Sequence, residues 1–219
     1  MALNKSVGNM FTFVSHTHNP IKGKCEVGCT FCYMCRDGIV KKPPRLVAKE
    51  LKDDLGQNNF IFVGSSIEMF GKNIDKEWIL KVLEYCNRYD NKYLFQTKRP
   101  EILYEYEEYL PKRSVIGLSL STNRDTSKIN NALIPIDRVE WFNKCITKNK
   151  VISIEPILDF DLIEFVEMIK SINPKFVSIG ADSKGHNLIE PTREKVDELI
   201  IKLKEFTEVK IKSNLARLK

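Results

Sequence analysis

Short apolar runs alternate with longer amphipathic patterns along this chain, and the alternation restricts the possible folds more than any other feature. The runs are rich in β-branched and aromatic residues, and the amphipathic stretches carry apolar residues at helical spacing. They predict strands at residues 10–15, 60–63, 93–96, 114–120, 151–155, 175–180 and 208–212, and helices at 46–55, 75–88, 100–109, 137–146, 161–171 and 192–206. Strands and helices that alternate in this way form βαβ units around a parallel sheet.

The length of the chain, 219 residues, limits how many βαβ units it can hold. Six or seven units are too few for a closed eight-fold barrel of typical size. We therefore expect an α/β fold with an open, partial (β/α)6 TIM-like barrel, formed as a single domain over residues 1–219. The longest irregular stretch, residues 122–136, is expected to be a mobile loop over the site.

Three cysteines, Cys25, Cys29 and Cys32, are spaced as Cys-x₃-Cys-x₂-Cys within one short stretch, residues 23–36. They supply three thiolates, one fewer than a closed iron–sulfur cluster or a structural zinc site needs. A [4Fe–4S] cluster held by them therefore keeps one iron open to a small molecule. A zinc site is the alternative, because Cys35 would add a fourth thiolate. Otherwise Cys35 is a bystander or a thiol on the substrate side.

The same stretch resembles the signature of the radical S-adenosylmethionine (radical SAM) enzymes, Cys-x₃-Cys-x-aromatic-Cys, with Phe31 as the aromatic residue and Tyr33 after the third cysteine. The resemblance implies one radical SAM domain over residues 1–219, with a [4Fe–4S] cluster whose open iron is chelated by S-adenosylmethionine (SAM). It also implies an external one-electron donor of the flavodoxin or ferredoxin type. In such enzymes the reduced cluster cleaves SAM to a 5′-deoxyadenosyl radical, which takes a hydrogen atom from the substrate.

Ligands of parallel α/β barrels bind at the carboxyl ends of the strands, so the residues that follow each predicted strand are candidates for SAM binding. Gly64, Ser65 and Ser66 stand where radical SAM proteins often have a Gly-Gly-Glu-like segment that contacts the methionine amino group. Ser119 and Ser121 lie two residues apart, so they share one face of a strand and are expected to line the ligand.

Four further residues at strand ends complete the predicted site. Glu155 is expected near the ribose hydroxyls of SAM, because a carboxylate accepts two hydroxyl hydrogen bonds at once. Gly180 lets a nucleoside approach the backbone closely. Lys98, with Arg99 beside it, is expected to meet a carboxylate or a phosphate; Lys98 and Cys35 are the candidate catalytic residues. Ordinary turns and helix caps remain the alternative at these positions.

Several segments also resemble a family of small radical-SAM-like proteins of phages and bacteria, loosely related to spore photoproduct lyase. They are Asn19-Pro20 and residues 62–65, 96–100, 117–119, 153–156 and 179–183, so the resemblance extends over about residues 16–212. It implies a substrate such as a nucleobase, a nucleotide or a nucleic acid. His18 departs from the family pattern, which usually has a tryptophan before Asn-Pro.

His16 and His18 form a His-x-His pair, which can bind metal. A satisfied or surface role is favoured, because no carboxylate set lies nearby in the sequence.

Charge and composition limit the possible partners and the cellular compartment of the protein. The net charge of +6, from 35 Lys+Arg against 29 Asp+Glu, permits a nucleic-acid partner without demonstrating one. The chain has no apolar run of about eighteen residues and no secretory stretch, so we expect neither a membrane span nor export. Six cysteines without a signal peptide fit a reducing cytoplasm better than a disulfide scaffold.

Two other classes of function stay open. One is a non-catalytic iron–sulfur or zinc-binding module that stabilises a partner or passes electrons. The other is a SAM-binding regulator with a degenerate site, which the imperfect match at Gly64, Ser65 and Ser66 suggests. The sequence leaves the substrate, the reaction and the oligomeric state undetermined.

Overall fold

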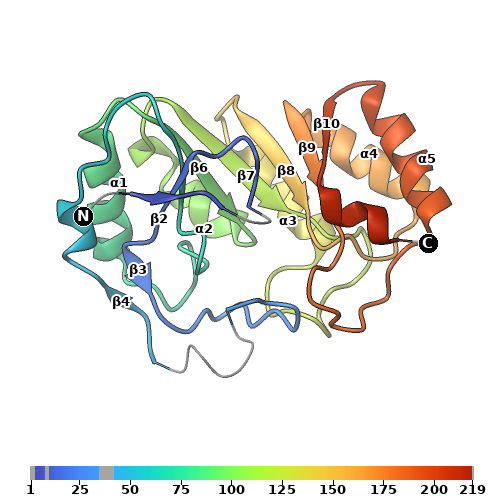
Figure 1. The fold of residues 1–219 in the computed structure, drawn as a ribbon, viewed down its shortest axis with the longest axis horizontal. Coiled ribbons are helices and arrows are strands. Elements are labelled where there is room, and N and C mark those ends of the chain that lie inside the picture. The colour runs from blue at the N-terminus through green and yellow to red at the C-terminus, as the bar shows by residue number, and fades with distance from the viewer. Residues whose placement is uncertain (1–2, 8–9, 35–41, 219) are drawn as a thin grey trace.

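The computed structural model of the protein describes residues 3–7, 10–34 and 42–218. Its main sheet has the strand order β1-β2-β5-β6-β7-β8-β9-β10, and a small second sheet pairs β3 with β4 (Figure 1). The strands are β1 (Asn4–Lys5), β2 (His16–His18), β3 (Ile21–Lys22), β4 (Arg45–Leu46), β5 (Phe60–Val63), β6 (Lys92–Thr97), β7 (Ser114–Ser119), β8 (Lys150–Ile154), β9 (Phe176–Ile179) and β10 (Glu208–Ile211). Neighbouring strands from β2 to β10 are parallel, and β1 runs antiparallel to β2.

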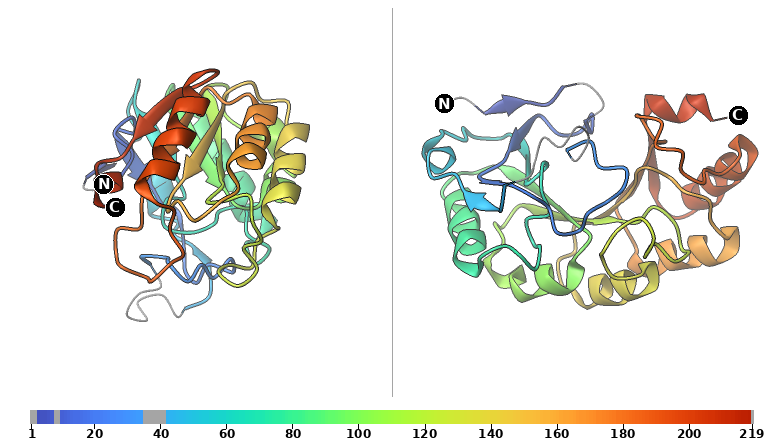
Figure 2. Two further views of the ribbon diagram at one scale, coloured as in Figure 1. Left: turned by 90° about the vertical axis from the view of Figure 1, so that its right-hand side faces the viewer. Right: turned by 90° about the horizontal axis from the view of Figure 1, so that it is seen from below.

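The main sheet is an open arc with its helices on the outer side (Figure 2). In the part of the chain that the structure describes, the strand order does not return from β10 to β1, so the barrel is not closed. The α-helices are α1 (Lys76–Asn87), α2 (Pro100–Glu105), α3 (Pro135–Lys144), α4 (Leu162–Ile172) and α5 (Arg193–Lys204), and the 3₁₀ helices are η2 (Glu50–Lys52), η3 (Glu107–Tyr109) and η4 (Ser213–Arg217). None of these helices combines the length and apolar character that a membrane span requires.

Local sequence explains where two of the long helices begin. The Asp75 side chain accepts a hydrogen bond from the backbone N–H of Glu77 at 2.8 Å, and the Thr192 side chain accepts one from Lys195 at 3.3 Å. Such caps satisfy backbone donors that a helix leaves unpaired at its first turn. Both positions agree with the starts predicted from the sequence, and the parallel strands from β5 to β10 lie where the apolar runs predict them.

Two predicted elements are wrong. Residues 10–15 do not form a strand: the chain turns there, with the N–H of Val14 donating to the carbonyl of Phe11 at 3.1 Å, and the first parallel strand is β2. Residues 46–55 do not form an α-helix but contain the end of β4 and the 3₁₀ helix η2. In the second case a tertiary contact outweighs the local pattern, since β4 pairs with β3 across the cysteine loop.

The inner face of the arc is apolar towards the amino-terminal ends of the strands and polar at their carboxyl ends. Phe62, Leu94, Val115 and Val151 pack there with Phe11, which plugs the amino-terminal end of the arc. Side chains alternate along a strand, so residues two positions further along face the same way. They are Gly64, Gln96, Gly117 and Ser153, and Ser119 follows on β7, so the carboxyl ends of the strands present small and polar groups above an apolar floor.

The irregular segment 122–136 is joined by hydrogen bonds to α3 and to the cysteine loop. Arg138, with 1% of its surface exposed, donates to the carbonyl of Leu133 and to the side chains of Thr126 and Asn130. The same segment bonds to the cysteine loop, because the N–H of Thr30 donates to the carbonyl of Ile129 at 3.0 Å. We conclude that this segment is a support for the cysteine loop.

Candidate active site

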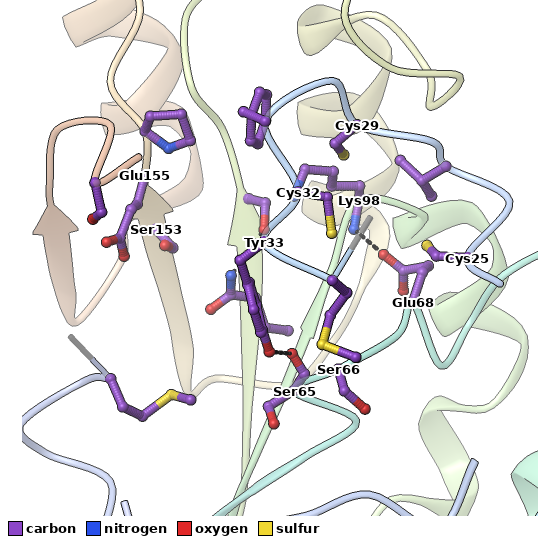
Figure 3. A pocket seen from close by; sticks show the side chains of 18 of the residues that line it. Cys25, Cys29, Cys32, Tyr33, Ser65, Ser66, Glu68, Lys98, Ser153 and Glu155 are labelled. Carbon is purple, nitrogen blue, oxygen red and sulfur yellow. Dashed lines mark hydrogen bonds between the residues drawn. The ribbon is translucent and has the colours of Figure 1, made fainter. Parts of the chain in front are cut away.

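A cavity of about 460 Å³ lies at the carboxyl ends of the strands, and the cysteine loop forms part of its wall. Cys25, Cys29 and Cys32 all line this cavity, each half-buried and none in a disulfide. Figure 3 shows their side chains grouped on one side, with Glu155 and Ser153 on the other. The geometry therefore brings the three thiols of the predicted motif to one ligand-sized space.

The backbone of the cysteine loop is shaped by two features. Gly28 has φ of +59°, and a Cβ there would approach the Asn131 side chain at 3.1 Å, so this position favours glycine. Glu26 forms a bidentate ion pair with Arg99, with both nitrogen–oxygen distances at 2.8 Å. Arg99 also donates to the carbonyl of Asn131 at 2.6 Å, so one guanidinium joins the loop to segment 122–136.

Burial and charge act in opposite directions on the thiols. Burial raises the pKa of Cys25 to about 11, although the backbone N–H groups of Glu68 and Val27 oppose the shift. Burial also raises the pKa of Cys29, and the positive charges of Lys98 and Arg138 oppose it. A metal or cluster is the natural partner of such thiols, because its charge displaces their protons.

The turn after β5 is fixed by Asn19, the residue that follows β2. Its side-chain carbonyl accepts from the backbone N–H of Ser66 at 3.0 Å and from the hydroxyls of Ser65 and Ser66 at 3.2 and 3.1 Å. Tyr33 donates its hydroxyl to the carbonyl of Ser65 at 3.0 Å (Figure 3). These bonds align the predicted Gly64–Ser66 segment along the cavity wall, next to the cysteine loop.

Glu68 lies in the same wall and is held by three donors. The hydroxyl of Thr97 and the backbone N–H of Lys98 donate to it at 2.7 Å each, and the N–H of Phe70 donates at 3.3 Å. Burial nevertheless raises the pKa of Glu68. The carboxyl group therefore ties the end of β6 to the turn after β5, beside the Cys25 sulfur.

The opposite side of the cavity carries an ion pair and a carboxylate–imidazole pair. Lys212 donates to Glu155 at 2.7 Å, and Asp182 bonds through one oxygen to the ring Nδ1 of His186 at 2.7 Å. The backbone N–H of His186 donates to the other oxygen at 2.6 Å. These donors hold the pKa of Asp182 below its usual range although its burial acts the other way. The lack of a side chain at Gly180 leaves room for the ion pair, because a Cβ there would lie 3.1 Å from Glu155 and Lys212 atoms.

Most of the predicted residues meet at this cavity. Its lining includes Cys25, Cys29, Phe31, Cys32, Tyr33, Gly64, Ser65, Ser66, Lys98, Ser119, Ser153 and Glu155. Ser121 lies beyond the end of β7, and neither it nor Gly180 is part of the lining. Cys35 falls outside the described residues.

Two arginines that follow β6 and β7 are engaged in ion pairs. Arg99 pairs with Glu26, as described above, and Arg124 is bound by Asp159 and Asp161, with 2.6 Å from its Nη2 to Asp161. Lys184 does line the cavity, as Lys98 does.

Sequence reasoning missed three polar groups of the far wall: Asp182, His186 and Lys212. Asp182 and His186 follow β9 four residues apart, which is a weak signal that a search for paired acid and imidazole groups could have used. Lys212 follows β10 and reaches Glu155 only because the two strand ends converge across β9.

Comparisons with known proteins give a likeness of fold. No protein-family model matches the sequence, and no curated protein matches it significantly. A solved mutant of spore photoproduct lyase superposes with a TM-score of 0.68 at 10% identity, covering 96% of this chain and 80% of that chain. The lyase complexed with dinucleoside spore photoproduct gives 0.63 at 11% identity, covering 94% and 78%. A mutant with bound AdoMet and dinucleoside spore photoproduct gives 0.57 at 10% identity, covering 94% and 66%. The likeness confirms the α/β fold with a partial, open barrel.

Proposed function

We propose that this protein is a radical SAM enzyme, in which Cys25, Cys29 and Cys32 hold a [4Fe–4S] cluster and the adjoining cavity binds SAM. The observation that carries the proposal is the convergence of three thiols from one loop on a cavity at the carboxyl ends of a partial barrel. The fold likeness supports it, since spore photoproduct lyase has been solved with bound AdoMet. The cluster and SAM, when bound, supply a 5′-deoxyadenosyl radical for hydrogen abstraction.

The residues present suit a cluster with three protein ligands. Three thiols reach the cavity, and buried positive charge from Arg138 and nearby Lys98 favours the thiolate form of Cys29. Cluster potentials respond to charge, hydrogen bonds to sulfur and solvent exposure. The backbone N–H groups of Glu68 and Val27 are hydrogen-bond donors to the Cys25 sulfur and would contribute to this potential.

The chain also offers groups that suit the two ends of SAM. Near the cysteines, the turn after β5 presents the Ser65 carbonyl and the Ser65 and Ser66 hydroxyls, which can accept from an ammonium group. On the far side, Glu155 presents a carboxylate for ribose hydroxyls. The apolar floor with Phe62 limits water in the cavity, which protects a reactive radical from unwanted hydrogen donors.

For the substrate, we propose a nucleobase, a nucleotide or a nucleic acid. Lys98 and Lys184 line the cavity and can meet phosphate oxygens, and the net charge of the chain is +6. The dinucleoside bound by the structural neighbour is consistent with this class. An external one-electron donor of the flavodoxin or ferredoxin type would reduce the cluster.

Anaerobic reconstitution with iron and sulfide tests the proposal. We expect about four irons per chain, a paramagnetic signal after dithionite reduction, and 5′-deoxyadenosine when SAM is added. Cys29→Ala should lose the cluster, while Cys86→Ala, which alters a buried cysteine of α1 away from the cavity, should keep it. A single zinc per chain with no iron would support the zinc module instead, and SAM binding without cleavage would support the regulator.

The substrate class has its own measurement. Binding of short DNA or RNA should weaken as salt rises, because phosphate contacts release counterions. Lys98→Gln and Lys184→Gln should each reduce the salt dependence, while Lys81→Gln, at an exposed position on α1, should not. Retention of nucleic acid that does not respond to salt or to these changes would argue against this substrate class.

A further inference from the structure

A second group of metal-binding side chains lies where β2 ends, apart from the cysteine cavity. A ring nitrogen of His18 and one carboxylate oxygen each from Glu50 and Asp53 lie within 4.8 Å of one another. The three residues are 1%, 6% and 5% exposed, respectively. None of them belongs to the lining of the cysteine cavity.

The buried ring of His18 indicates that this group of side chains binds a further ligand. Its Nε2 is buried and has no hydrogen-bond partner among the described residues. Burial of a polar atom without a partner is unfavourable, so buried groups of this kind are rare. An imidazole nitrogen is a common metal ligand, and a metal ion would give the buried Nε2 the partner it lacks.

The charges of the group also favour a cation. Glu50 accepts from the Lys22 ammonium at 2.6 Å, and Glu50 and Asp53 together bring two carboxylates to the His18 ring. The side chain of Lys22 is 40% exposed, so water can solvate its ammonium if Glu50 turns to another partner. Buried carboxylates are usually paired or coordinate a metal.

We propose that His18, Glu50 and Asp53 bind a divalent transition-metal ion, with Zn²⁺ as the representative, at a site separate from the cluster. One imidazole and two carboxylates are ligands that Zn²⁺ accepts, and bonds of about 2.0–2.2 Å place two ligands of one ion roughly 3–4 Å apart. The observed spacing needs only a small closing movement of the side chains. Three protein ligands leave a coordination position for water.

The position of this site gives the metal a structural role. His18 ends β2, while Glu50 begins η2 and Asp53 follows it, so the ion would join the chain before the cysteine loop to the chain after it. The pairing of β3 with β4 joins the same two segments. His18 also precedes Asn19, which fixes the Ser65–Ser66 turn. A metal here would stabilise the base of the loop and the turn beside the cavity.

The test removes the competing thiolates. In a full-length variant with Cys25, Cys29, Cys32 and Cys35 replaced by alanine, we expect one equivalent of Zn²⁺ or Co²⁺ to bind in a calorimetric titration. The Co²⁺ complex should show ligand-field bands without thiolate charge transfer. Zn²⁺ should raise the melting temperature of this variant, because an ion that binds only the folded state stabilises it.

Variants on this background assign the site. His18→Gln and Glu50→Gln should weaken binding at least about a hundredfold, more than the loss of an outer-shell partner costs. The chain has three histidines, so His16→Gln and His186→Gln are the matched controls and should leave the affinity unchanged. Circular dichroism establishes that each variant folds.

Two outcomes would overturn the proposal. One is that the cysteine-free variant binds no metal with saturation, which decides the matter even if a His18 variant fails to fold. The other is that His18→Gln and Glu50→Gln, once folded, bind the ion as tightly as the two histidine controls. Neither outcome bears on the radical SAM proposal, which is tested by iron content and SAM cleavage in the chain with its cysteines intact.

Discussion

The ion pair between Glu26 and Arg99 should be the main support of the cysteine loop, and Glu26→Gln tests this. The Arg99 side chain is 3% exposed and that of Glu26 is 17% exposed, and their two bonds are 2.8 Å long. Removal of one partner from a buried ion pair costs roughly 3–5 kcal/mol, because it leaves the other charge buried without compensation. Arg99 keeps Glu101 at 3.5 Å and the Asn131 carbonyl at 2.6 Å, so we expect the low end, about 3 kcal/mol.

Urea unfolding of the cluster-free protein measures this loss without interference from iron. At about 1.4 kcal/mol per tenfold change, 3 kcal/mol corresponds to roughly a hundredfold or more in the unfolding equilibrium. Glu77→Gln is the control, because its pair with Lys81 is 3.4 Å long and well exposed, and its loss should cost less than about 0.5 kcal/mol. A loss for Glu26→Gln as small as that of the control would refute the proposed support.

The other predictions concern single residues around the cavity. Gly64→Ala should cost more stability than Gly185→Ala in thermal melts: both have positive φ, but only at Gly64 would a Cβ meet a neighbouring side chain, at 3.1 Å. Asp182→Asn should lower stability above about pH 4, the range in which the carboxylate is charged in both states. Because the folded-state pKa of Asp182 is depressed, this difference should shrink as the pH falls further, in urea titrations at several pH values. If SAM binds as proposed, Asn19→Ala should weaken its binding by calorimetry about tenfold or more, since four bonds to the serine turn are lost.

Periodicity was sufficient to predict the sheet from β5 to β10, because each of these strands is a short apolar run between helical patterns. The same reasoning fails for residues 10–15, whose apolar residues are buried as predicted but by a turn. Phe11 and Val14 fill the amino-terminal end of the arc, so burial alone did not distinguish a plug from a strand. Residues 46–55 mislead in a similar way, because Leu46 belongs to a strand whose partner lies before the cysteine loop.

In the candidate site, too, residues marked by local sequence were predictable and residues that depend on distant partners were not. Residues next to a recognisable motif or at the end of a predicted strand, such as Cys29 or Ser119, could be placed from the sequence. Residues that act through distant partners could not: His18 meets Glu50 and Asp53 more than thirty residues further along the chain. The absence of nearby carboxylates in the sequence was therefore no guide to the surroundings of His18 in the fold.

Two buried arginines, Arg138 and Arg99, lie near the cysteine loop. Arg138 is almost fully buried, and its described hydrogen bonds go to neutral acceptors, so burial lowers its pKa to about 10. A buried guanidinium without a carboxylate partner is a cost to stability, which an apolar side chain of similar size would avoid. Its charge acts favourably on the Cys29 thiolate, and Arg99 holds the loop that carries Cys29. The proposed cluster, held by three thiolates, would bring negative charge into the same region. The cost of burying Arg138 in the cluster-free protein would therefore be offset when Cys29 is ionised, which would couple the stability of this region to binding of the proposed cluster.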